Sequence, residues 1–270
     1  MKSLVTKWLI LELIGAVILV AVLGWSGAFE SKEPPENPQM AMAEPMFAAE
    51  FESIFDGKTL NGWEGDKDFW SVQDGMIVGE IKEGVSLEAN TFLIFKQPVK
   101  DFELKVEFRI SEKGNSGIQY RSDRVEGVPF GLRGYQADID GNNTYTGQNY
   151  EERKRTTLAY RGQKTRISSQ PNDVAEIRDY VENNAWKGLN LESELGDRAE
   201  LGAQIKKQDW NEMHLIIRGT TLQHYVNGIL MSEVLDLDTK NQSLEGLLGF
   251  QVHRGPPMKV EFREVRLRRF

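Results

Sequence analysis

The stretch GYQADID at residues 134–140 alternates as a β-strand does, and it gathers acceptor groups on one face. Three polar residues share that face: Gln136, Asp138 and Asp140. Alternate residues of a strand lie roughly 6.5–7 Å apart along one face, so two carboxyl groups here share an environment and their pKa values can separate. Such a row either faces bulk water or lines a site.

Two other stretches carry polar residues on strands. GNSGIQYRS at 114–122 is a turn followed by alternation, with Gln119 and Arg121 on the side opposite Tyr120. GLLGFQVHRGPP at 246–257 leads through Gln251 to His253, just before a rigid Gly-Pro-Pro turn. A strand-end imidazole beside a rigid turn is suited to proton transfer, although a hairpin tip with a surface arginine and a structural histidine are the simpler readings.

The other two histidines, His214 and His224, lie inside hairpin strands, which indicates packing or surface roles. The sequence contains no Ser-His-Asp order, HExxH, phosphate-binding loop or dinucleotide-binding glycine motif. The glycine-rich pieces therefore read as turns.

The segments around these residues predict strands almost everywhere from residue 51 onward. DFELKVEFRIS at 101–111 alternates cleanly and puts Glu107 on its polar face. Asn227-Gly228 predicts a tight type I′ hairpin, Arg218–Thr220 another turn, and the slipped apolar phase near 263–264 a bulge. Many short strands without alternating helices predict an all-β fold, an antiparallel two-sheet jelly-roll sandwich.

One segment breaks the β pattern. NDVAEIRDYVENNAW at 172–186 follows a proline, begins with a capping residue and repeats apolar residues at helical spacing. We expect a small helical insertion at about 168–200.

The N-terminus is organised differently. Residues 1–28 carry an early basic region, an apolar run and small residues at 26–28, as a signal peptide does. The run at 8–25 is also compatible with a retained inner-membrane anchor. Residues 29–50 are rich in Pro, Glu and Ala and predict a disordered linker. Both alternatives place the domain at 51–270 in the periplasm or outside the cell.

Composition excludes several classes. The net charge of −8 argues against nucleic-acid binding through phosphate neutralisation. Cysteine is absent, which excludes disulfides, Cys-ligated zinc and a cysteine nucleophile.

Taken together, FESIFDGKTLNGWEG, FWSVQDGMIVG, DFELKVEFRIS, GNSGIQYRS, GYQADID, WNEMHLIIRGTTLQHYVNG and GFQVHRGPPMKVEFREVRL resemble the 3-keto-disaccharide hydrolase family in order and spacing. The resemblance covers about 52–270 apart from the helical insertion. It implies a concanavalin A-like jelly roll whose concave sheet forms a carbohydrate cleft. It also implies cleavage of glycosides that carry a ketone at sugar C3.

Elimination from a 3-keto glycoside needs a base at C2, a donor at the enolate oxygen and an acid for the leaving oxygen. Our candidates for these roles are Asp138 as the base, Arg121 as the donor at the enolate oxygen, and His253 as the acid or a second base. The remaining substrate-binding candidates are Glu107, Gln119, Tyr120, Tyr135, Gln136, Asp140, Tyr150 and Gln251. The sequence identifies no definite cofactor, and an Asp/His cluster could equally hold a divalent cation that polarises the ketone.

This sequence departs from the family pattern at three positions. Gln136 stands where the family often has Glu, Asp138 where it often has Gln, and Arg254 separates His253 from the glycine. Two rival functions stay open: a non-catalytic lectin-like sugar-binding domain, and a β-glucanase-like hydrolase with Gln136 and Asp140 at the catalytic flanks. The second lacks the carboxyl pair that retaining hydrolysis needs.

Overall fold

The structure, a computed structural model, describes residues 50–169 and 186–270. The predicted export segment, almost all of the linker and most of the predicted helical stretch lie outside the described residues. Within the described ranges, no helix is both long and apolar enough to cross a membrane.

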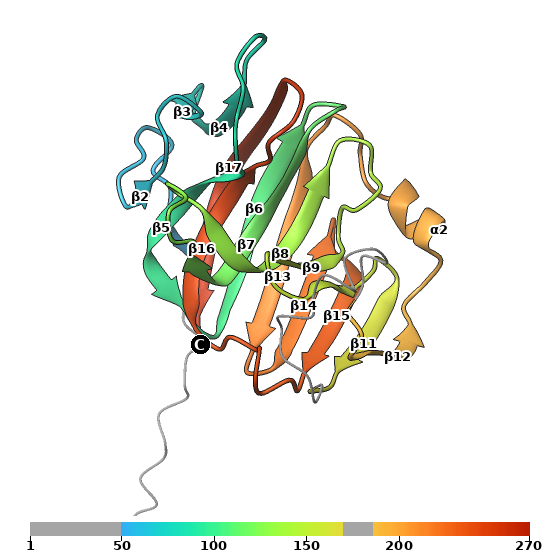
Figure 1. Cartoon of the computed structure of the whole chain (residues 1–270). Helices are drawn as coiled ribbons and strands as arrows, with labels where there is room; N and C mark the ends of the chain where they lie inside the picture. The colour runs from blue at the N-terminus through green and yellow to red at the C-terminus, as the bar shows by residue number, and fades with distance from the viewer. Residues whose placement is uncertain (1–49, 170–185) are drawn as a thin grey trace, which may run out of the picture. The chain divides into compact units, whose positions relative to one another are not determined.

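The described chain folds into two β-sheets that lie one over the other (Figure 1). The larger sheet contains, in spatial order, β12 (Leu189–Glu194), β11 (Gln163–Ile167), β15 (Ile229–Asp236), β14 (Thr221–Val226), β13 (Asn211–Arg218), β6 (Phe102–Ile110), β17 (Met258–Arg269), β4 (Met76–Ile81) and β3 (Trp70–Gln73), with β1 (Glu52–Ser53) beside β17. The smaller sheet contains β10 (Thr156–Ala159), β9 (Asn149–Glu152), β8 (Leu132–Asp140), β7 (Asn115–Arg124), β16 (Gly246–Val252), β5 (Thr91–Val99) and β2 (Trp63–Glu64).

Apolar side chains from the facing sides of the two sheets form the core. Phe250 of β16 stacks on Phe262 of β17 with ring centroids 4.2 Å apart, and Trp63 of β2 also stacks on Phe250, with centroids 5.1 Å apart. Burial of such large aromatic surfaces is the main force that holds two sheets together. The all-β sandwich predicted from the sequence is confirmed.

Several local predictions are also confirmed. The apolar face of DFELKVEFRIS is buried along β6, as its alternation requires. Asn227 and Gly228 join β14 to β15 with φ values of 52° and 79°, the positive pair that a type I′ turn needs. The pairing of β17 with β6 shifts between Arg263 and Arg266, where Glu264 has φ 50°. This shift is the predicted bulge.

Two features differ from the expectation. The sheets are antiparallel except where β11 pairs with β15 in parallel. The described part of the predicted insertion contains strand β12 and the start of a single short helix, α2 (Arg198–Ala203), which begins after Asp197. The Asp197 carboxylate accepts from the amides of Ala199 and Glu200, so the helix starts at a normal N-cap.

The hairpin formed by β7 and β8 bends back over the smaller sheet. Its register shifts between Tyr120 and Asp123, and Arg121 has φ 47°. Beyond this bulge, the amide of Phe92 on β5 donates to the Phe130 carbonyl, and Arg124 pairs with Glu64 of β2. A bulge that bends a strand is a common way to shape a site on a sheet face.

Candidate active site

Strand β8 separates its two faces completely. Tyr135, Ala137 and Ile139 belong to the core between the sheets. Gln136, Asp138 and Asp140 lie on the opposite face, yet each is less than a tenth exposed. The polar row is therefore covered by other parts of the chain and does not face bulk water.

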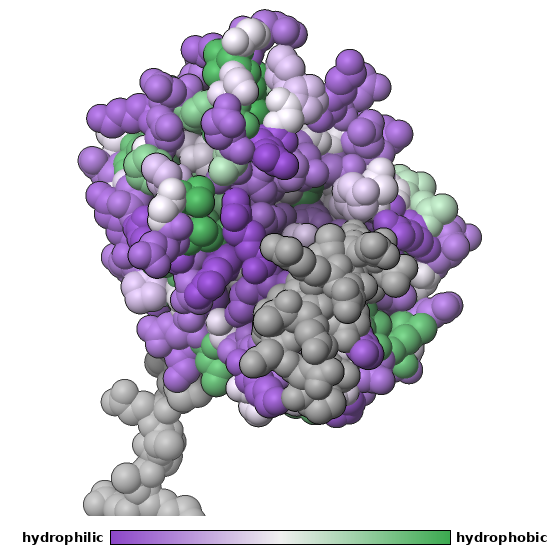
Figure 2. Space-filling model, in the orientation of Figure 1, coloured by the Kyte–Doolittle hydropathy of each residue, from purple (hydrophilic) through white to green (hydrophobic). Residues whose placement is uncertain are grey.

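A pocket of about 160 Å³ opens over this face, and we call it the inner pocket. Its lining comes from β7, β8, β9 and two loops: Asn115, Gln136, Asp138, Tyr145, Gln148, Tyr150, Glu152 and His253. Figure 2 shows that hydrophilic residues dominate the surface seen from this side. The pocket therefore brings together four sequence candidates from three separate parts of the chain: Gln136 and Asp138, Tyr150, and His253.

Asp138 is the most strongly perturbed acid in this pocket. Gln136 Nε2 donates to its Oδ1 at 2.7 Å, and Gln148 Nε2 donates to its Oδ2 at 2.6 Å. Burial raises the pKa of Asp138 to about 7, the two amide donors oppose that rise, and the negative charges of Glu152 and Asp140 add to it. A carboxyl group with a pKa near neutrality is suited to general base catalysis.

Asp140 organises the loop that follows β8. Its carboxylate accepts from the backbone amides of Thr144, Tyr145 and Thr146 at 2.8–2.9 Å and from the Thr146 hydroxyl. Both carboxylate oxygens are therefore engaged within this turn. The turn delivers Gln148 to Asp138, so Asp140 positions a neighbour of the carboxyl group and is corrected from a substrate ligand to a loop anchor.

A second pocket of about 470 Å³ adjoins the first, and we call it the outer pocket. It is lined by Glu88, Ala89, Asn90, Tyr150, Glu152, Arg153, His253 and Arg254. Tyr150, Glu152 and His253 line both pockets. The two pockets are therefore adjacent parts of one cleft.

Glu152 was missed by the sequence reasoning. Asn90 Nδ2 donates to its Oε1 at 3.2 Å, and Arg153 Nε lies 3.7 Å from the same oxygen. Burial raises the pKa of Glu152, while Arg153 and the Asn90 amide oppose that rise. Alternation along β9 gave the missing signal, because Tyr150 and Glu152 share one face while Glu151 turns inward.

His253 lies where β16 ends, and its backbone amide donates to the Asn115 carbonyl at 3.3 Å. Its Nδ1 lies 2.6 Å from the Arg254 carbonyl. A carbonyl oxygen only accepts, so Nδ1 carries the proton and the neutral ring has a lone pair at Nε2. Burial lowers the pKa of His253, which favours this neutral form.

Gln119 and Gln251 are fully buried on the same face of the sheet. Gln119 Nε2 donates to Gln136 Oε1 at 3.3 Å, which leaves the Gln136 amide to donate to Asp138. Gln119 therefore contacts Asp138 only through the Gln136 side chain. It lies behind the residues that line the pocket.

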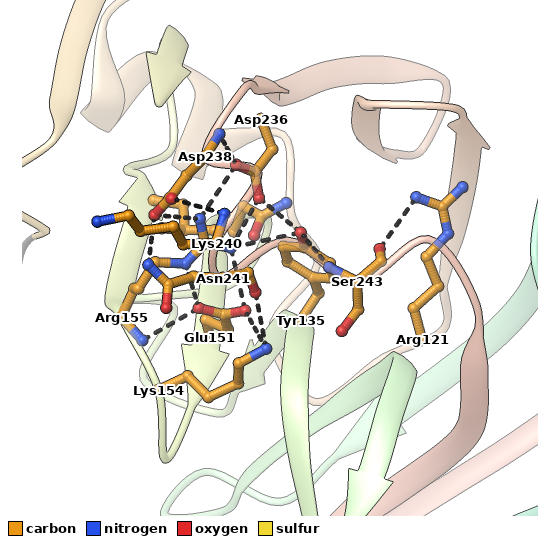
Figure 3. Close-up of polar contacts among 12 residues, drawn as sticks. Arg121, Tyr135, Glu151, Lys154, Arg155, Asp236, Asp238, Lys240, Asn241 and Ser243 are labelled. Carbon is orange, nitrogen blue, oxygen red and sulfur yellow. Dashed lines mark hydrogen bonds and ion pairs between the residues drawn. The ribbon is translucent and has the colours of Figure 1, made fainter. Parts of the chain in front are cut away.

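Arg121 lines neither pocket, so its predicted role as the donor at the enolate oxygen is corrected. Its guanidinium donates to the carbonyls of Lys100 and Gly219 and to the Asp101 carboxylate at 2.6–2.8 Å. Figure 3 shows it directed at the Ser243 carbonyl. The positive φ of Arg121 turns the side chain away from the Gln119 face, so it ties loops together.

Tyr120 and Tyr135 are core residues and cannot stack on a sugar. Their rings stack on each other with centroids 5.6 Å apart, and both are almost fully buried. The Tyr120 hydroxyl contacts His224 Nε2, and the Tyr135 hydroxyl donates to Asp236 beside the buried Arg155 (Figure 3). His224 is thus a packing residue, as predicted.

Glu107 is also far from the cleft. It lies on the outer side of the larger sheet, where Arg263 Nε donates to it at 2.6 Å. The expectation that Glu107 contacts substrate is wrong, because alternation on β6 points its polar face away from the other sheet.

Asp138, Glu152 and His253 all line the inner pocket, but among the described residues no three His, Asp or Glu side chains are grouped closely enough to hold a metal ion together. No step below uses a metal.

Comparison with known proteins agrees with this architecture. Residues 50–268 match the description of a 3-keto-alpha-glucoside-1,2-lyase-like domain. The chain belongs to this family. A 3-keto-disaccharide hydrolase of Bacteroides thetaiotaomicron is 34% identical over 137 residues. That alignment covers 42% of this chain and 46% of the relative, so it spans about half the length of either protein.

Two solved structures are similar to this family member at low identity, and the first has a TM-score above 0.5, which supports a shared fold. A putative glycosyl hydrolase from Parabacteroides distasonis has a TM-score of 0.51 and 15% identity, with 82% of this chain and all of that chain covered. A galectin-like protein of unknown function from Bacillus subtilis has a TM-score of 0.48 and 11% identity, with 82% and 98% covered.

Proposed function

We propose that this protein cleaves the glycosidic bond of 3-keto-glycosides by elimination followed by hydration. The observation that carries the proposal is Asp138, a buried carboxyl group with a pKa of about 7 in the cleft of a 3-keto-alpha-glucoside-1,2-lyase-like domain. The name of the Bacteroides relative supports the same substrate class.

The chemistry explains why a base of this kind is needed. A ketone at C3 acidifies the proton at C2, because the resulting negative charge moves onto the ketone oxygen. Asp138 removes that proton, and its pKa near 7 balances the ionised fraction against basicity at neutral pH. The two glutamine donors keep the carboxylate oriented for this transfer.

The developing enolate oxygen needs a donor in place of Arg121. We assign this role to the side-chain amide of Asn115, which lines the inner pocket from the start of β7. An amide donor in a partly enclosed pocket stabilises developing charge more strongly than water does. Gln136 and Gln148 are already committed to Asp138.

The rival functions fit the cleft less well. Retaining glucanase chemistry at Gln136 and Asp140 has no nucleophile, because Gln136 is an amide and Asp140 is bound within its loop. A lectin-like platform built on Tyr120 and Tyr135 is excluded by their burial in the core.

The test compares a 3-keto glucoside with the same unoxidised glucoside, using the purified protein. Aglycone should be released only from the oxidised compound, and Asp138→Asn should slow release at least ~100-fold. Asp68→Asn, an exposed site, serves as the matched control. Equal activity on both glucosides, or none on either, would defeat the elimination mechanism.

We also propose that the protein acts in the periplasm or outside the cell, because residues 1–28 have the pattern of an export segment. Fractionation of cells that express the full chain would check this. Recovery of the protein in the cytoplasmic fraction would contradict it.

A further inference from the structure

The boundary between the two pockets separates residues of different character. Asp138 and Gln148 line only the inner pocket, whereas Arg153 and Arg254 line only the outer pocket. Glu152 is one of three residues that line both. A bond that is cleaved between two bound groups must lie at such a boundary.

We propose that the outer pocket is the leaving-group subsite and that Glu152 is the acid that protonates the departing glycosidic oxygen. This inference rests on the function proposed above. The oxidised sugar then occupies the inner pocket, with its C2 at Asp138 and its C1 directed at Glu152.

The contacts of Glu152 suit this role. Its side chain is 13% exposed; Oε1 contacts Asn90 and Arg153, and a side-chain hydrogen bond with Gln251 also favours its ionised form. Its position in the lining of both pockets leaves the carboxyl group accessible to a bound ligand on either side. Burial also raises its pKa, so the carboxyl group holds a proton more readily than an exposed glutamate does.

His253, the acid expected from the sequence, is less suited. Its Nδ1 proton is donated to the Arg254 carbonyl, and the neutral ring has no proton at Nε2 to give. His253 Nε2 is instead an acceptor for a sugar hydroxyl. The proton for the leaving oxygen must then come from another group at the same boundary, and Glu152 is the carboxyl group there.

The proposed steps balance. Asp138 takes the C2 proton, and the C–H electron pair forms the enolate whose charge is on the C3 oxygen. Those electrons then form the C1=C2 double bond while the ketone re-forms, and the C1–O bond breaks with its pair on the leaving oxygen. Glu152 protonates that oxygen. In hydration, Glu152 takes a proton from the water that attacks C1, and Asp138 returns its proton to C2.

The two carboxyl groups support each other in this cycle. The charge of Glu152 is among the causes that raise the pKa of Asp138, so the state with both ionised is disfavoured and one proton between them is favoured. Elimination needs this proton on Glu152 and a free carboxylate on Asp138, which is one of the two ways in which the pair can hold a single proton.

The outer pocket also indicates the class of leaving group. Glu88, Asn90, Arg153 and Arg254 give it hydrogen-bonding groups of both charges. Its volume of about 470 Å³ is roughly three times that of the inner pocket. A hydroxyl-rich leaving group, such as a second sugar unit, fits this lining better than an apolar one.

The test uses two 3-keto glucosides that differ only in leaving group. One releases 4-nitrophenolate, a stable anion that needs no proton, and the other releases an alkoxide-type leaving group such as a second glucose. Glu152→Gln should lower the single-turnover rate of leaving-group release, which precedes hydration, at least ~100-fold on the disaccharide and less than ~5-fold on the nitrophenyl compound. Glu83→Gln makes the same change at an exposed glutamate and should leave both rates unchanged.

Equal loss on both substrates would overturn the inference, because a structural role slows both reactions alike. Unchanged rates on both would also overturn it. Glu152→Asp, which keeps the acid but shortens its reach, should show the same split with a smaller loss and serves if the glutamine variant folds poorly. Failure of the native protein on both oxidised substrates would instead defeat the proposed function.

Discussion

Gln148 Nε2 donates to Asp138 Oδ2 across 2.6 Å, from a loop whose conformation is fixed by Asp140. The two aspartates of one strand face thus have different tasks. Asp140 accepts backbone amides and shapes the turn, while Asp138 stays in the pocket with two amide donors. The loop anchor and the reactive carboxyl group are coupled through Gln148.

The Gln148 contact sets the pH dependence of activity. Asp138 must be ionised to act as a base, so activity should fall as the pH drops through about 7. Gln148→Leu removes a donor that favours the ionised form, so the acid limb of kcat/KM should move upward by about one pH unit. Gln223→Leu, whose amide bonds Glu233 on the larger sheet, should leave the profile in place. An unmoved limb in Gln148→Leu would show that Asp138 does not control it.

Asp138 should also reduce stability at alkaline pH. Its pKa is raised in the folded protein, so the unfolded chain loses this proton first and stability declines as pH rises from about 4 to about 7. Asp138→Asn removes that penalty. At pH 8 the free energy of unfolding of the variant should exceed that of the native protein by on the order of 1–3 kcal/mol. At pH 4.5 the difference should be small. Urea denaturation at the two pH values checks this, and an equal gain at both would contradict it.

Local patterns in the sequence predicted those parts of the fold that depend on neighbouring residues. The alternation in β6, the Asn227-Gly228 turn and the bulge at Glu264 each follow from the conformational preferences of a few adjacent residues. The inward and outward faces of GYQADID follow in the same way. Gln136 and Asp138 therefore reached the cleft as predicted.

Long-range features could not be read from those patterns. Simple alternation puts Arg121 on the Gln119 face, but the bulge after Tyr120 reverses its direction. Tyr120 and Tyr135 lie opposite Gln119 and Gln136, as alternation predicts, and their assignment to substrate binding failed because the second sheet covers that face. Glu152 joins the site only because the bent hairpin and β9 bring it to Asn90.

Gly117 leaves room for the side chain that orients the base. A Cβ at Gly117 would lie 2.5 Å from Cδ of Gln136 and 2.8 Å from its Nε2, so the amide that donates to Asp138 would have to shift. Gly117→Ala should therefore lower kcat/KM roughly 10- to 100-fold, since a displacement of about 1 Å in a positioning group has effects of this size. Gly255→Ala, where a Cβ meets nothing within 4 Å, is the matched control in the loop after His253. Similar activity in the two variants would show that the position of Gln136 does not matter.

The buried charges behind the site should control stability and leave the chemistry unchanged. Arg155 is fully buried and pairs with Glu151, Asp236 and Asp238 at 2.6–3.4 Å (Figure 3). Arg155→Met leaves these carboxylates buried without their partner, which should cost about 3–5 kcal/mol of unfolding free energy.

Arg166→Met is the control, because Arg166 pairs with Glu192 at 2.6 Å on the surface and should change stability by less than about 1 kcal/mol. Urea denaturation of the two variants at pH 7 makes the comparison. Comparable losses in both would mean that the Arg155 cluster is solvated and contributes no more than a surface pair. A large loss confined to Arg155→Met, with kcat retained in the folded fraction, would place the cluster in the scaffold that holds β8 and β9 together beneath Asp138 and Glu152.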